Sequence, residues 1–579
     1  MRCTWEMIKS ISNMHPNREN LKKIIWDGTE FVDDLLISEA FNEYFISVPT
    51  KLAEDIPQTN IDPLSYIQWS NPSSLYLNPV CPFECQKVIT NLKNSKEELN
   101  HLPVTLFKEY SFLFVHTVCD LVNASFQSGV FPEKLKVARV IPVYKRGDRE
   151  NINNYRPISM LSFMSKIYEK LLYTRLIKFI NNHNILYDLQ FGFRTGTSTT
   201  DAISCLVEYL YEVINQKQYA INIFIDFSRA FDTVDRKILL RKLERYGVRG
   251  PALNLISDYF TNRKQYVQFN SCSSSVRPID CGVVQGSVLG PLFFLLYIND
   301  LPKISKIFRT ILFADDSTLS VKGSDLREVS NLCNVELVKL LDWTRSNRLC
   351  INISKTVFNV VSTRSTDCTI HIQLDSQDIV RQDRVKFLGI ILDDKLKFNH
   401  HITEIASKIS KSIGIMYKLK YYLPCTTLKT IYYSLIYSKL FYGNIVWGCT
   451  YANHLKPLVL LQKKAIRIVN KTSYLHHTNE LFLSNSILKL TDVTKLNLAV
   501  FFFKNQNLPR FYSNHLYPTR AGSLPQSNFQ RLTVTQQSVY FRAPPIWNSL
   551  PDQIKSAPSL FSFKKRTKLY LVSTYESNQ

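Results

Sequence analysis

The sequence predicts an α+β protein in which a sheet with helices packed on one face precedes a largely helical region. In the middle third, apolar strand-like segments such as "AINIFIDF" alternate with amphipathic helix patterns such as "DRKILLRKLERYG". Two pairs of strand segments are separated by short polar stretches, as expected for hairpins. After about residue 385 the chain becomes helical and rich in Lys and Tyr. These patterns together favour the α+β class.

The first third is expected to form a basic lobe covered by helices. Residues 1–75 are mixed and end in "SNPSSLYLNP", whose Pro, Ser and Asn residues indicate a boundary. A helical stretch follows over 80–135, and "ARVIPVYKRGD" reads as a strand that runs into a basic turn. In "SKIYEKLLYTRLIKFI", Ile167, Leu171 and Leu176 recur at helical spacing.

The middle third supplies the expected sheet. The segments expected to be strands or helices are, in order, a strand at 220–227, a helix at 235–247, a hairpin of 264–270 with 276–283, a helix at 289–301, a hairpin of 309–313 with 317–321, a helix at 324–347 and a strand at 356–362. The turn of the second hairpin is Ala314-Asp315-Asp316.

Size and charge limit the classes of function. The chain has 579 residues, enough for two to four lobes, and its 71 Lys and Arg against 48 Asp and Glu give a net charge of +23. Such a surplus favours a polyanionic partner, first nucleic acid and second an acidic membrane surface. No apolar run reaches the roughly 18 residues of a spanning helix, and the N-terminus has no apolar signal core. We therefore expect an intracellular protein without a membrane segment.

Two weaker patterns have ordinary alternatives. Cys81 and Cys85, with His116 and Cys119, could be drawn as a zinc site, but the spacing is irregular and buried or free thiols are the favoured reading. Lys and Tyr interleaved on the helices after residue 385 could line a nucleic-acid groove. An ordinary helical bundle with lysines on its surface explains that pattern equally well.

Adjacent carboxylates follow an apolar run in "ILFADDSTLS". Asp315 and Asp316 could occupy an ordinary exposed turn, but Asp226 and Asp232 lie at the end of another predicted strand. If the two strands are neighbours, carboxylates converge at one sheet edge, where they repel one another unless a cation binds between them. Oxygen ligands without nearby His or Cys favour Mg²⁺, or Mn²⁺ in its place. Two such ions about 4 Å apart can assist an in-line phosphoryl displacement.

Several motifs occur in an order that resembles one family. "FIDFSRAFDTVDR", "CGVVQGSVLGPLFFLLYINDLP" and "LFADDSTL" resemble the palm motifs of the reverse transcriptases of non-LTR (LINE-type) retrotransposons, of the jockey and chicken-repeat-1 groups. "ARVIPVYKRGDRENINNYRPISML" and "LQFGFRTGTSTTDAI" resemble the fingers motifs. "NISKT" and "FLGIILDDKLKFNHHI" resemble the last palm motif and the primer grip, and the segment after Val539 resembles the C-terminal tail of these elements. The resemblance covers about residues 80–572.

The resemblance implies a right-hand polymerase with a helical thumb and C-terminal region. The implied domains are an N-terminal linker remnant at 1–75, fingers at 76–215, a palm with the catalytic core at 216–395, a helical thumb at 396–475 and a C-terminal extension at 476–579. Relatives usually carry an N-terminal endonuclease, for which residues 1–75 are too short. We therefore expect a truncated element or a partial gene model that polymerises but does not nick its own target.

The resemblance also implies roles for particular residues. The implied assignments are metal binding for Asp226, the Phe227 carbonyl, Asp315 and Asp316; protonation of the leaving pyrophosphate by Lys355; triphosphate binding by Lys145 and Arg156; exclusion of a 2′-OH by Phe231; contact with the nascent base pair by Gln285 and Gly286; and a primer grip at Phe387, Leu388 and Gly389. Asp316 has the alternative of a supporting turn residue, and Lys145 and Arg156 that of surface charge. Val284 stands where family members usually carry Pro.

The implied activity is extension of a primer 3′-OH with dNTPs on an RNA template, by two Mg²⁺ ions or Mn²⁺. The implied partners are an RNA template, a DNA primer or target DNA, and dNTPs, with work in the nucleus. "KKRTK" near residue 564 reads equally well as an import signal or as thumb surface. The rival readings are an RNA-dependent RNA polymerase and a catalytically decayed retroelement-derived protein that only binds nucleic acid. The sequence indicates no oligomeric state.

Overall fold

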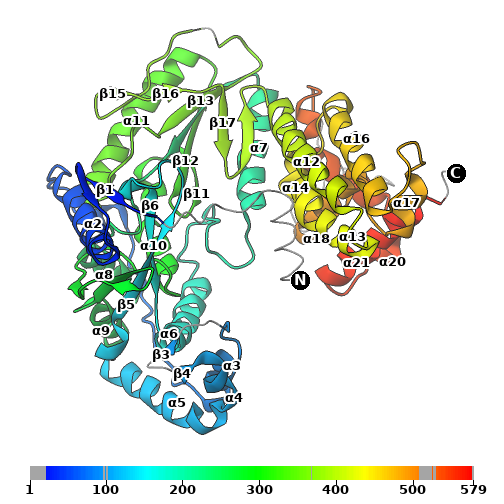
Figure 1. The fold of residues 1–579 in the computed structure, drawn as a ribbon. Helices are drawn as coiled ribbons and strands as arrows, with labels where there is room; N and C mark the ends of the chain where they lie inside the picture. Colours follow the sequence, from blue (N-terminus) through cyan, green and yellow to red (C-terminus); the bar gives the residue numbers. More distant parts are fainter. Residues whose placement is uncertain are drawn as a thin grey trace.

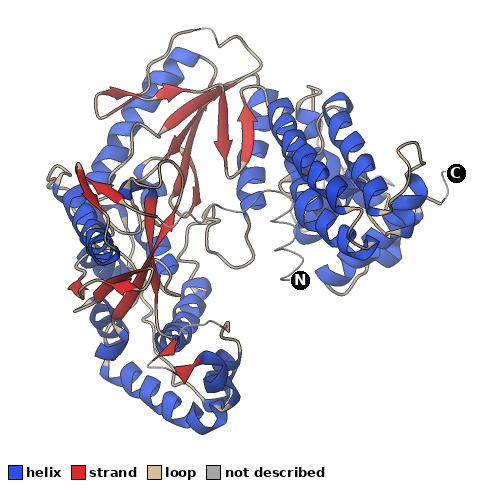
Figure 2. Ribbon diagram, in the orientation of Figure 1, coloured by secondary structure: helices blue, strands red, loops and turns tan. Residues whose placement is uncertain are grey.

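The computed structural model describes residues 21–94, 98–99, 102–366, 368–506, 525 and 530–576. Figure 1 shows a sheet-containing body formed by the first two thirds of the chain and, beside it, a helical body formed by the last third. In Figure 2 the strands are confined to the first body. The α+β class predicted from the sequence is confirmed.

The central sheet contains strands from three separate parts of the sequence. Its order is β11-β12-β7-β13-β16. Its strands are β7 (Tyr219–Ile225), β11 (Arg309–Phe313), β12 (Asp316–Gly323), β13 (Val357–Val361) and β16 (Val380–Arg381). β12 runs antiparallel to β7, with Ser317 opposite Ile225 and Val321 opposite Ile221. This register sets the ends of β7 and β12 side by side.

A second sheet has the order β10-β8-β5-β6, with β9 paired to β8. Its strands are β5 (Val137–Tyr144), β6 (Tyr155–Met160), β8 (Lys264–Phe269), β9 (Cys272–Ser273) and β10 (Arg277–Pro278). The predicted pairing of the segments at 264–270 and 276–283 is confirmed, because β8 and β10 are antiparallel. These strands join β5 and β6, however, and form a sheet separate from the one that carries the carboxylates.

Helices cover both sheets. Those of the first body are α2 (Asp34–Glu54), α3 (Pro82–Thr90), α4 (Val104–Glu109), α5 (Ser111–Ser128), α6 (Phe163–Asn182), α7 (Thr199–Asn215), α8 (Arg236–Arg245), α9 (Pro251–Phe260), α10 (Gly290–Tyr297) and α11 (Leu326–Ser346). Short elements complete it: β1 (Ile24–Trp26), β2 (Thr29–Phe31), β3 (Glu98–Leu99), β4 (Leu102–Pro103), β14 (Gln373–Leu374), β15 (Gln377–Asp378), η1 (Pro63–Tyr66), η2 (Glu133–Leu135), η3 (Ile152–Asn154) and η4 (Leu301–Ile304). One apolar core, which includes Ile223, Phe294 and Leu319, joins the central sheet to these helices, apart from α2 and α7.

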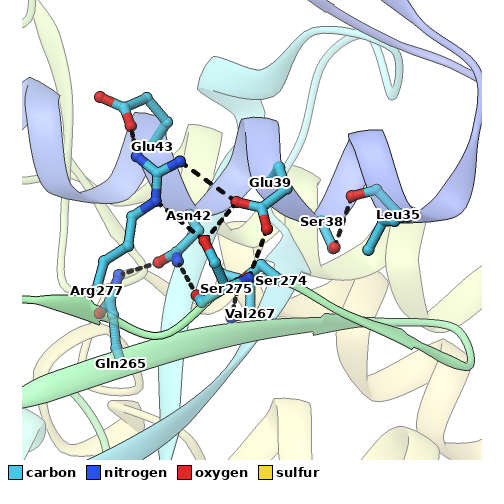
Figure 3. Close-up of polar contacts among 10 residues, drawn as sticks. All are labelled: Leu35, Ser38, Glu39, Asn42, Glu43, Gln265, Val267, Ser274, Ser275 and Arg277. Atoms are coloured by element: carbon cyan, nitrogen blue, oxygen red, sulfur yellow. Dashed lines mark hydrogen bonds and ion pairs between the residues drawn. The ribbon is translucent and has the colours of Figure 1, made fainter.

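Helix α2 lies in the segment expected to be a linker remnant, and it is packed against the second sheet (Figure 3). Asn42 donates to the carbonyl of Ser275 at 2.8 Å and accepts from Gln265 at 3.1 Å. Glu39 and Glu43 both pair with Arg277. Buried apolar side chains of α2 fill the space beneath these polar contacts. The helix is therefore part of the folded body.

The second body is helical. It follows the hairpin of β17 (Arg384–Phe387) and β18 (Ile390–Asp393). Its elements are α12 (Asn399–Leu419), α13 (Cys425–Tyr432), η5 (Tyr433–Tyr437), α14 (Ser438–Phe441), α15 (Asn444–Trp447), α16 (Ala452–Val469), α17 (Asn479–Ser484), α18 (Leu490–Asn505), η7 (Thr535–Gln537), α19 (Val539–Asn548), α20 (Asp552–Lys555) and α21 (Leu560–Ser573). The "KKRTK" segment belongs to α21, whose Phe563 and Thr567 are buried. None of the helices described, from α2 to α21, has the length and apolar character needed to span a bilayer.

Helix α7 ties the two bodies together. Its apolar residues belong to the core of the helical body rather than to that of the central sheet. Its Glu208 is buried and accepts the hydroxyl of Ser538 at 2.5 Å and the backbone N–H of Val539 at 2.7 Å, at the start of α19. Burial raises the pKa of Glu208 to about 7. The C-terminal helices are thus docked onto α7 by a specific polar contact.

The first testable prediction concerns a buried ion pair behind the central sheet. Lys242 Nζ donates to Asp300 Oδ1 and to the carbonyl of Tyr297, each at 2.6 Å, and Trp343 donates to Asp300 Oδ2 at 3.2 Å. The Asp300→Asn variant leaves the Lys242 ammonium buried without a counter-charge, which costs about 3–5 kcal/mol.

Guanidinium unfolding followed by tryptophan fluorescence measures this loss. Glu30→Gln is the matched control, because Glu30 pairs with Lys23 at 2.9 Å while more than half exposed. We expect this exposed pair to contribute under about 1 kcal/mol. Equal midpoints for the two variants would contradict the assignment.

Candidate active site

The ends of β7 and β12 bring three carboxylates together. Asp226 follows the last residue of β7, Asp316 is the first residue of β12, and Asp315 lies in the turn before it. Phe313 pairs with Asp316 across the β11–β12 hairpin, so the turn consists of Ala314 and Asp315. The convergence expected from the sequence is therefore present.

The electrostatics of the three groups show that they are crowded. Burial, followed by the charges of Asp315 and Asp226, raises the pKa of Asp316 to about 6. Burial is also the main cause of the raised pKa of Asp315, to which the Asp226 charge adds. Arg156 and Lys145 act in the opposite direction on both groups. At this corner of the sheet, burial and mutual repulsion therefore both disfavour the charged form of the carboxylates.

Three cations face the carboxylates. Lys355 Nζ lies 3.6 Å from Asp226 Oδ2, with both side chains about half exposed. Lys145 and Arg156 come from the second sheet, where the backbone N–H of Lys145 donates to the carbonyl of Asn154 at 2.8 Å. Burial, then repulsion by Arg156 and Lys355, lowers the pKa of Lys145. The site therefore has an acidic floor on one sheet and basic side chains on the other.

The backbone beyond β7 is fixed by a second chain segment. Phe227 forms an isolated antiparallel bridge with Ile351, and the carbonyl of Asp226 accepts from the N–H of Asn352 at 2.7 Å. The buried Thr356 hydroxyl accepts from the N–H of Asp226 at 3.4 Å. These contacts hold Asp226 and Phe227 in place next to the "NISKT" segment.

The donor set suits a hard divalent cation. Its side-chain donors are carboxylates alone, and their mutual repulsion is relieved by a positive ion. Within the described ranges, however, no three His, Cys, Asp or Glu side chains are close enough to form a ready cluster for a metal. The carboxylates therefore match Mg²⁺ in ligand type, but they would have to move toward one another to share an ion. The same finding covers the cysteines of the alternative zinc site, where Cys119 Sγ donates to the carbonyl of Val80 at 3.0 Å.

Phe231 lies in the loop that follows Asp226. One face of its ring stacks on Phe294 of α10, with centroids 4.3 Å apart and planes at 22°. Phe193 meets it edge-on, at 6.2 Å and 86°. Phe294 is fully buried, whereas Phe231 is half-buried. The Phe231 ring is thus supported from within the protein and remains partly exposed.

The loop of Gln285 and Gly286 is pressed against β6. The carbonyl of Gln285 accepts from the N–H of Ser159 at 2.8 Å, and Gly286 has φ +108°. A Cβ on Gly286 would lie 2.4 Å from the Ser159 carbonyl, so no other residue fits here. Val284, in place of the Pro expected in the family, is buried against Ala138 and Leu161.

Asp232 does not join the other carboxylates. It is buried and accepts from Gln285 Nε2 at 2.8 Å, with Arg229 at 4.0 Å. Burial raises the pKa of Asp232 to about 6, against the effects of Arg229 and the Gln285 hydrogen bond. Asp232 therefore orients Gln285, whereas the sequence had grouped it with Asp226.

The residues expected to form the primer grip make the turn of the β17–β18 hairpin. Phe387 pairs with Ile390, and both Leu388 (φ 43°) and Gly389 (φ 86°) have positive φ, as in a two-residue hairpin loop. Phe387 packs against Phe224 of β7, with ring centroids 5.7 Å apart. Tyr442 donates to the carbonyl of Leu388 at 2.5 Å. The hairpin thus links the central sheet to the helical body.

Sequence reasoning missed the segment Gln190–Phe193, which lies against the Ala314–Asp315 turn. Gln190 Oε1 accepts from the N–H of Ala314 at 3.2 Å. A Cβ on Gly192 would lie 2.3 Å from the same nitrogen. The sequence indicates only that "LQFGFR" is part of a segment that resembles a fingers motif. Nothing in its residue types predicts a contact with a turn more than 100 residues away.

The comparisons with known proteins agree with these motifs. Residues 143–392 match the family model described as "Reverse transcriptase (RNA-dependent DNA polymerase)". The matched range contains the three carboxylates, Lys355 and all of the β17–β18 hairpin except Asp393. It therefore coincides with the site described above.

Among curated proteins, two Drosophila melanogaster sequences are similar over most of the chain. The probable RNA-directed DNA polymerase from transposon X-element is 27% identical over 459 residues, 76% of this chain and 50% of the relative. The RNA-directed DNA polymerase from mobile element jockey is 27% identical over 461 residues, 76% of this chain and 49% of the relative. This chain thus spans about half the length of these relatives.

Among solved structures, the RNA-dependent RNA polymerase of a human picorbirnavirus is similar at a TM-score of 0.36 and 12% identity, covering 82% of this chain and 87% of that one. The family match and the two relatives confirm the resemblance drawn from the motifs and the polymerase fold expected with it. Residues 143–392 are thus similar to reverse transcriptase domains, and the chain is similar to the RNA-directed DNA polymerases of the jockey and X-element transposons.

Proposed function

We propose that the protein is an RNA-directed DNA polymerase, which extends a primer 3′-OH with dNTPs on an RNA template. The observation that carries this proposal is the convergence of Asp226, Asp315 and Asp316 on one sheet, opposite Lys145 and Arg156 on the other. An acidic floor facing cations is the arrangement that a nucleoside triphosphate with bound divalent ions requires. The reverse transcriptase match over the same residues supports the choice of reaction.

The proposed cofactor is a pair of Mg²⁺ ions, for which Mn²⁺ can substitute. Asp226, Asp315 and Asp316 would hold the ions, with the Phe227 carbonyl as a further ligand. When bound, the ions supply charge stabilisation at the attacking and leaving oxygens of a phosphoryl transfer. Asp316, whose pKa is raised to about 6 by burial and by its neighbours, has most to gain from a nearby positive charge.

The remaining residues of the site bind and orient the substrate. Arg156 suits bidentate contact with phosphate oxygens, and Lys145 suits a single contact by point charge. Lys355, which approaches Asp226 from the "NISKT" segment, is positioned to give a proton to the departing pyrophosphate. Gln285, oriented by Asp232, and Gly286 provide a surface on which the nascent base pair can lie closely.

The proposed partners are an RNA template and a DNA primer or target. The net charge of +23 supports a long polyanion. The end of α12 presents Tyr417, Tyr421 and Tyr422, at least half exposed, with Lys420 lying 4.1 Å from the Tyr417 ring centroid. Amines and exposed rings together bind phosphates and stack on bases. We further propose that the protein works in the nucleus, where chromosomal DNA can serve as the primer.

The second testable prediction is that the activity depends on the acidic corner. On poly(rA) primed with oligo(dT), with Mg²⁺ and dTTP, we expect Asp315→Asn to lower incorporation at least about 100-fold, because a ligand charge is lost where charge develops. Asp552→Asn removes an equally charged but 97% exposed side chain in α20 and should leave incorporation unchanged. Equal background signal from wild type and Asp315→Asn would instead indicate a decayed protein that only binds nucleic acid.

The third testable prediction concerns the sugar. Truncation in Phe231→Ala removes the ring proposed to collide with a 2′-OH, so UTP should be used in place of dTTP about 10- to 100-fold more readily than by wild type. Single-nucleotide incorporation on poly(rA)·oligo(dT) gives the two kcat/KM values. Preference of the wild type for UTP over dTTP would establish an RNA polymerase and exclude the proposal.

The fourth testable prediction separates two roles of Lys355. If it donates a proton, Lys355→Met and Lys355→Arg should both lower kcat about 100-fold with little change in KM for dTTP. If it serves only as the charge partner of Asp226, Lys355→Arg should retain full activity while Lys355→Met loses it. Presteady-state incorporation of dTTP by the two variants distinguishes the two results.

A further inference from the structure

One loop contacts both the turn of Asp315 and the ring of Phe231. It consists of Gln190, Phe191, Gly192 and Phe193, and lies between α6 and α7; we call it the 190–193 loop. The inference drawn from it rests on the proposed function, because it concerns how the polymerase distinguishes deoxynucleotides from ribonucleotides. Its two contacts are separate and can be described in turn.

The first contact fixes the loop on the edge strand β11. Phe191 donates its N–H to the carbonyl of Leu312 at 2.8 Å, and Leu312 donates its own N–H to the carbonyl of Leu189 at 3.0 Å. Gln190 is 1% exposed, and its Oε1 accepts from the N–H groups of both Gly192 and Ala314. The loop is therefore hydrogen-bonded to the strand and to the turn that follows it.

Gly192 allows the 190–193 loop to pack closely against the turn that carries Asp315. Its missing side chain lets the loop backbone lie directly against the backbone of Phe313 and Ala314, since a Cβ would come within 2.3 Å. Ala314 itself has φ 53°, a conformation that an alanine adopts only when its surroundings impose it. The position of the next residue, Phe193, is thus set by the same contacts that hold the catalytic turn.

The second contact is made by Phe193. Its backbone has φ 50°, which is unusual for a bulky residue, and its ring is 58% exposed. In this backbone conformation the Phe193 ring makes an edge-to-face contact with Phe231, with centroids 6.2 Å apart and planes at 86°. Phe231 is then held between this edge and the buried face of Phe294.

We propose that Phe193 is a positioning residue for sugar selection, which acts by fixing the rotation of the Phe231 ring. Phe294 supports one face of Phe231 but does not by itself stop the ring from tilting away when a 2′-OH presses against it. The edge-to-face contact with Phe193 restrains this tilt. Without it, Phe231 yields to the extra volume of a 2′-OH, and ribonucleotides enter more readily.

The size of the effect follows from the strength of an aromatic pair. Edge-to-face pairs contribute about two- to tenfold in an equilibrium constant beyond their buried area. We therefore expect Phe193→Ala to raise the ratio of kcat/KM for UTP to that for dTTP about two- to tenfold on poly(rA)·oligo(dT). Incorporation of dTTP itself should stay within about threefold of wild type, which also shows that the variant is folded.

Further variants separate positioning from a general structural role. Phe193→Tyr keeps the ring edge and should retain the wild-type ratio, whereas Phe193→Leu keeps bulk without the edge and should behave like Phe193→Ala. In a variant that already carries Phe231→Ala, the further change Phe193→Ala should have no additional effect on the ratio. Phe83→Ala, which removes a ring 79% exposed on α3, is the matched control and should change nothing.

Two results would overturn the inference and leave the proposed function standing. One is a wild-type ratio in both Phe193→Ala and Phe193→Leu while Phe231→Ala relaxes the selection. The other is a full additive effect of Phe193→Ala in the Phe231→Ala background. If wild type incorporates no nucleotide with either Mg²⁺ or Mn²⁺, the proposed function fails, and the role of Phe193 in sugar selection fails with it.

Discussion

The register between β7 and β12 is the constraint on which the rest of the site depends. With Ser317 opposite Ile225, the residue that follows β7 and the residue that begins β12 come to the same corner of the sheet. Side chains alternate between the two faces of a strand, so a slip of one residue would turn Asp316 to the other face. The fully buried residues of β7 and β12, such as Ile223 and Leu319, make such a slip costly, because it would expose apolar side chains.

Once the carboxylates are fixed in this way, the positive charges around them partly offset their repulsion. A corner that raises the pKa of Asp316 to about 6 is unfavourable by itself, and the fold places Lys145, Arg156 and Lys355 around it. These cations lessen the repulsion only in part, so the corner still favours a divalent ion. The same cations can bind phosphate, so under the proposed function the unfavourable corner and its basic surroundings form two halves of one substrate site.

The sequence was sufficient for the local parts of this arrangement. Apolar runs predicted β7, β11 and β12, and the two Asp residues after "ILF" indicated a strand end with an unusual charge. The contacts that hold the site could not be predicted from the sequence, because they join residues far apart in the chain. Gln190 contacts Ala314 and Asp232 binds Gln285, and neither periodicity nor composition encodes such pairs.

Two larger features were also beyond local patterns. The sequence predicts one sheet that contains β8 and β10 together with β7, β11 and β12. They belong instead to the second sheet, because β8 pairs in parallel with β5, more than 120 residues earlier. Helix α2 was expected in a linker, yet it packs on this sheet through Asn42 and Glu39 (Figure 3). In both cases the free energy gained by burial against a distant part of the chain outweighs the local conformational preference of a short segment.

The central claim is that Asp226, Asp315 and Asp316 form one binding site for divalent ions. Electron paramagnetic resonance measures free Mn²⁺ during a titration of the 579-residue chain with dTTP on poly(rA)·oligo(dT) whose primer lacks a 3′-OH, and the bound ions follow as the difference between total and free Mn²⁺. The account predicts two bound ions per protein, with at least one lost in Asp315→Asn and none lost in Asp552→Asn. Identical Mn²⁺ binding by wild type and Asp315→Asn would contradict it.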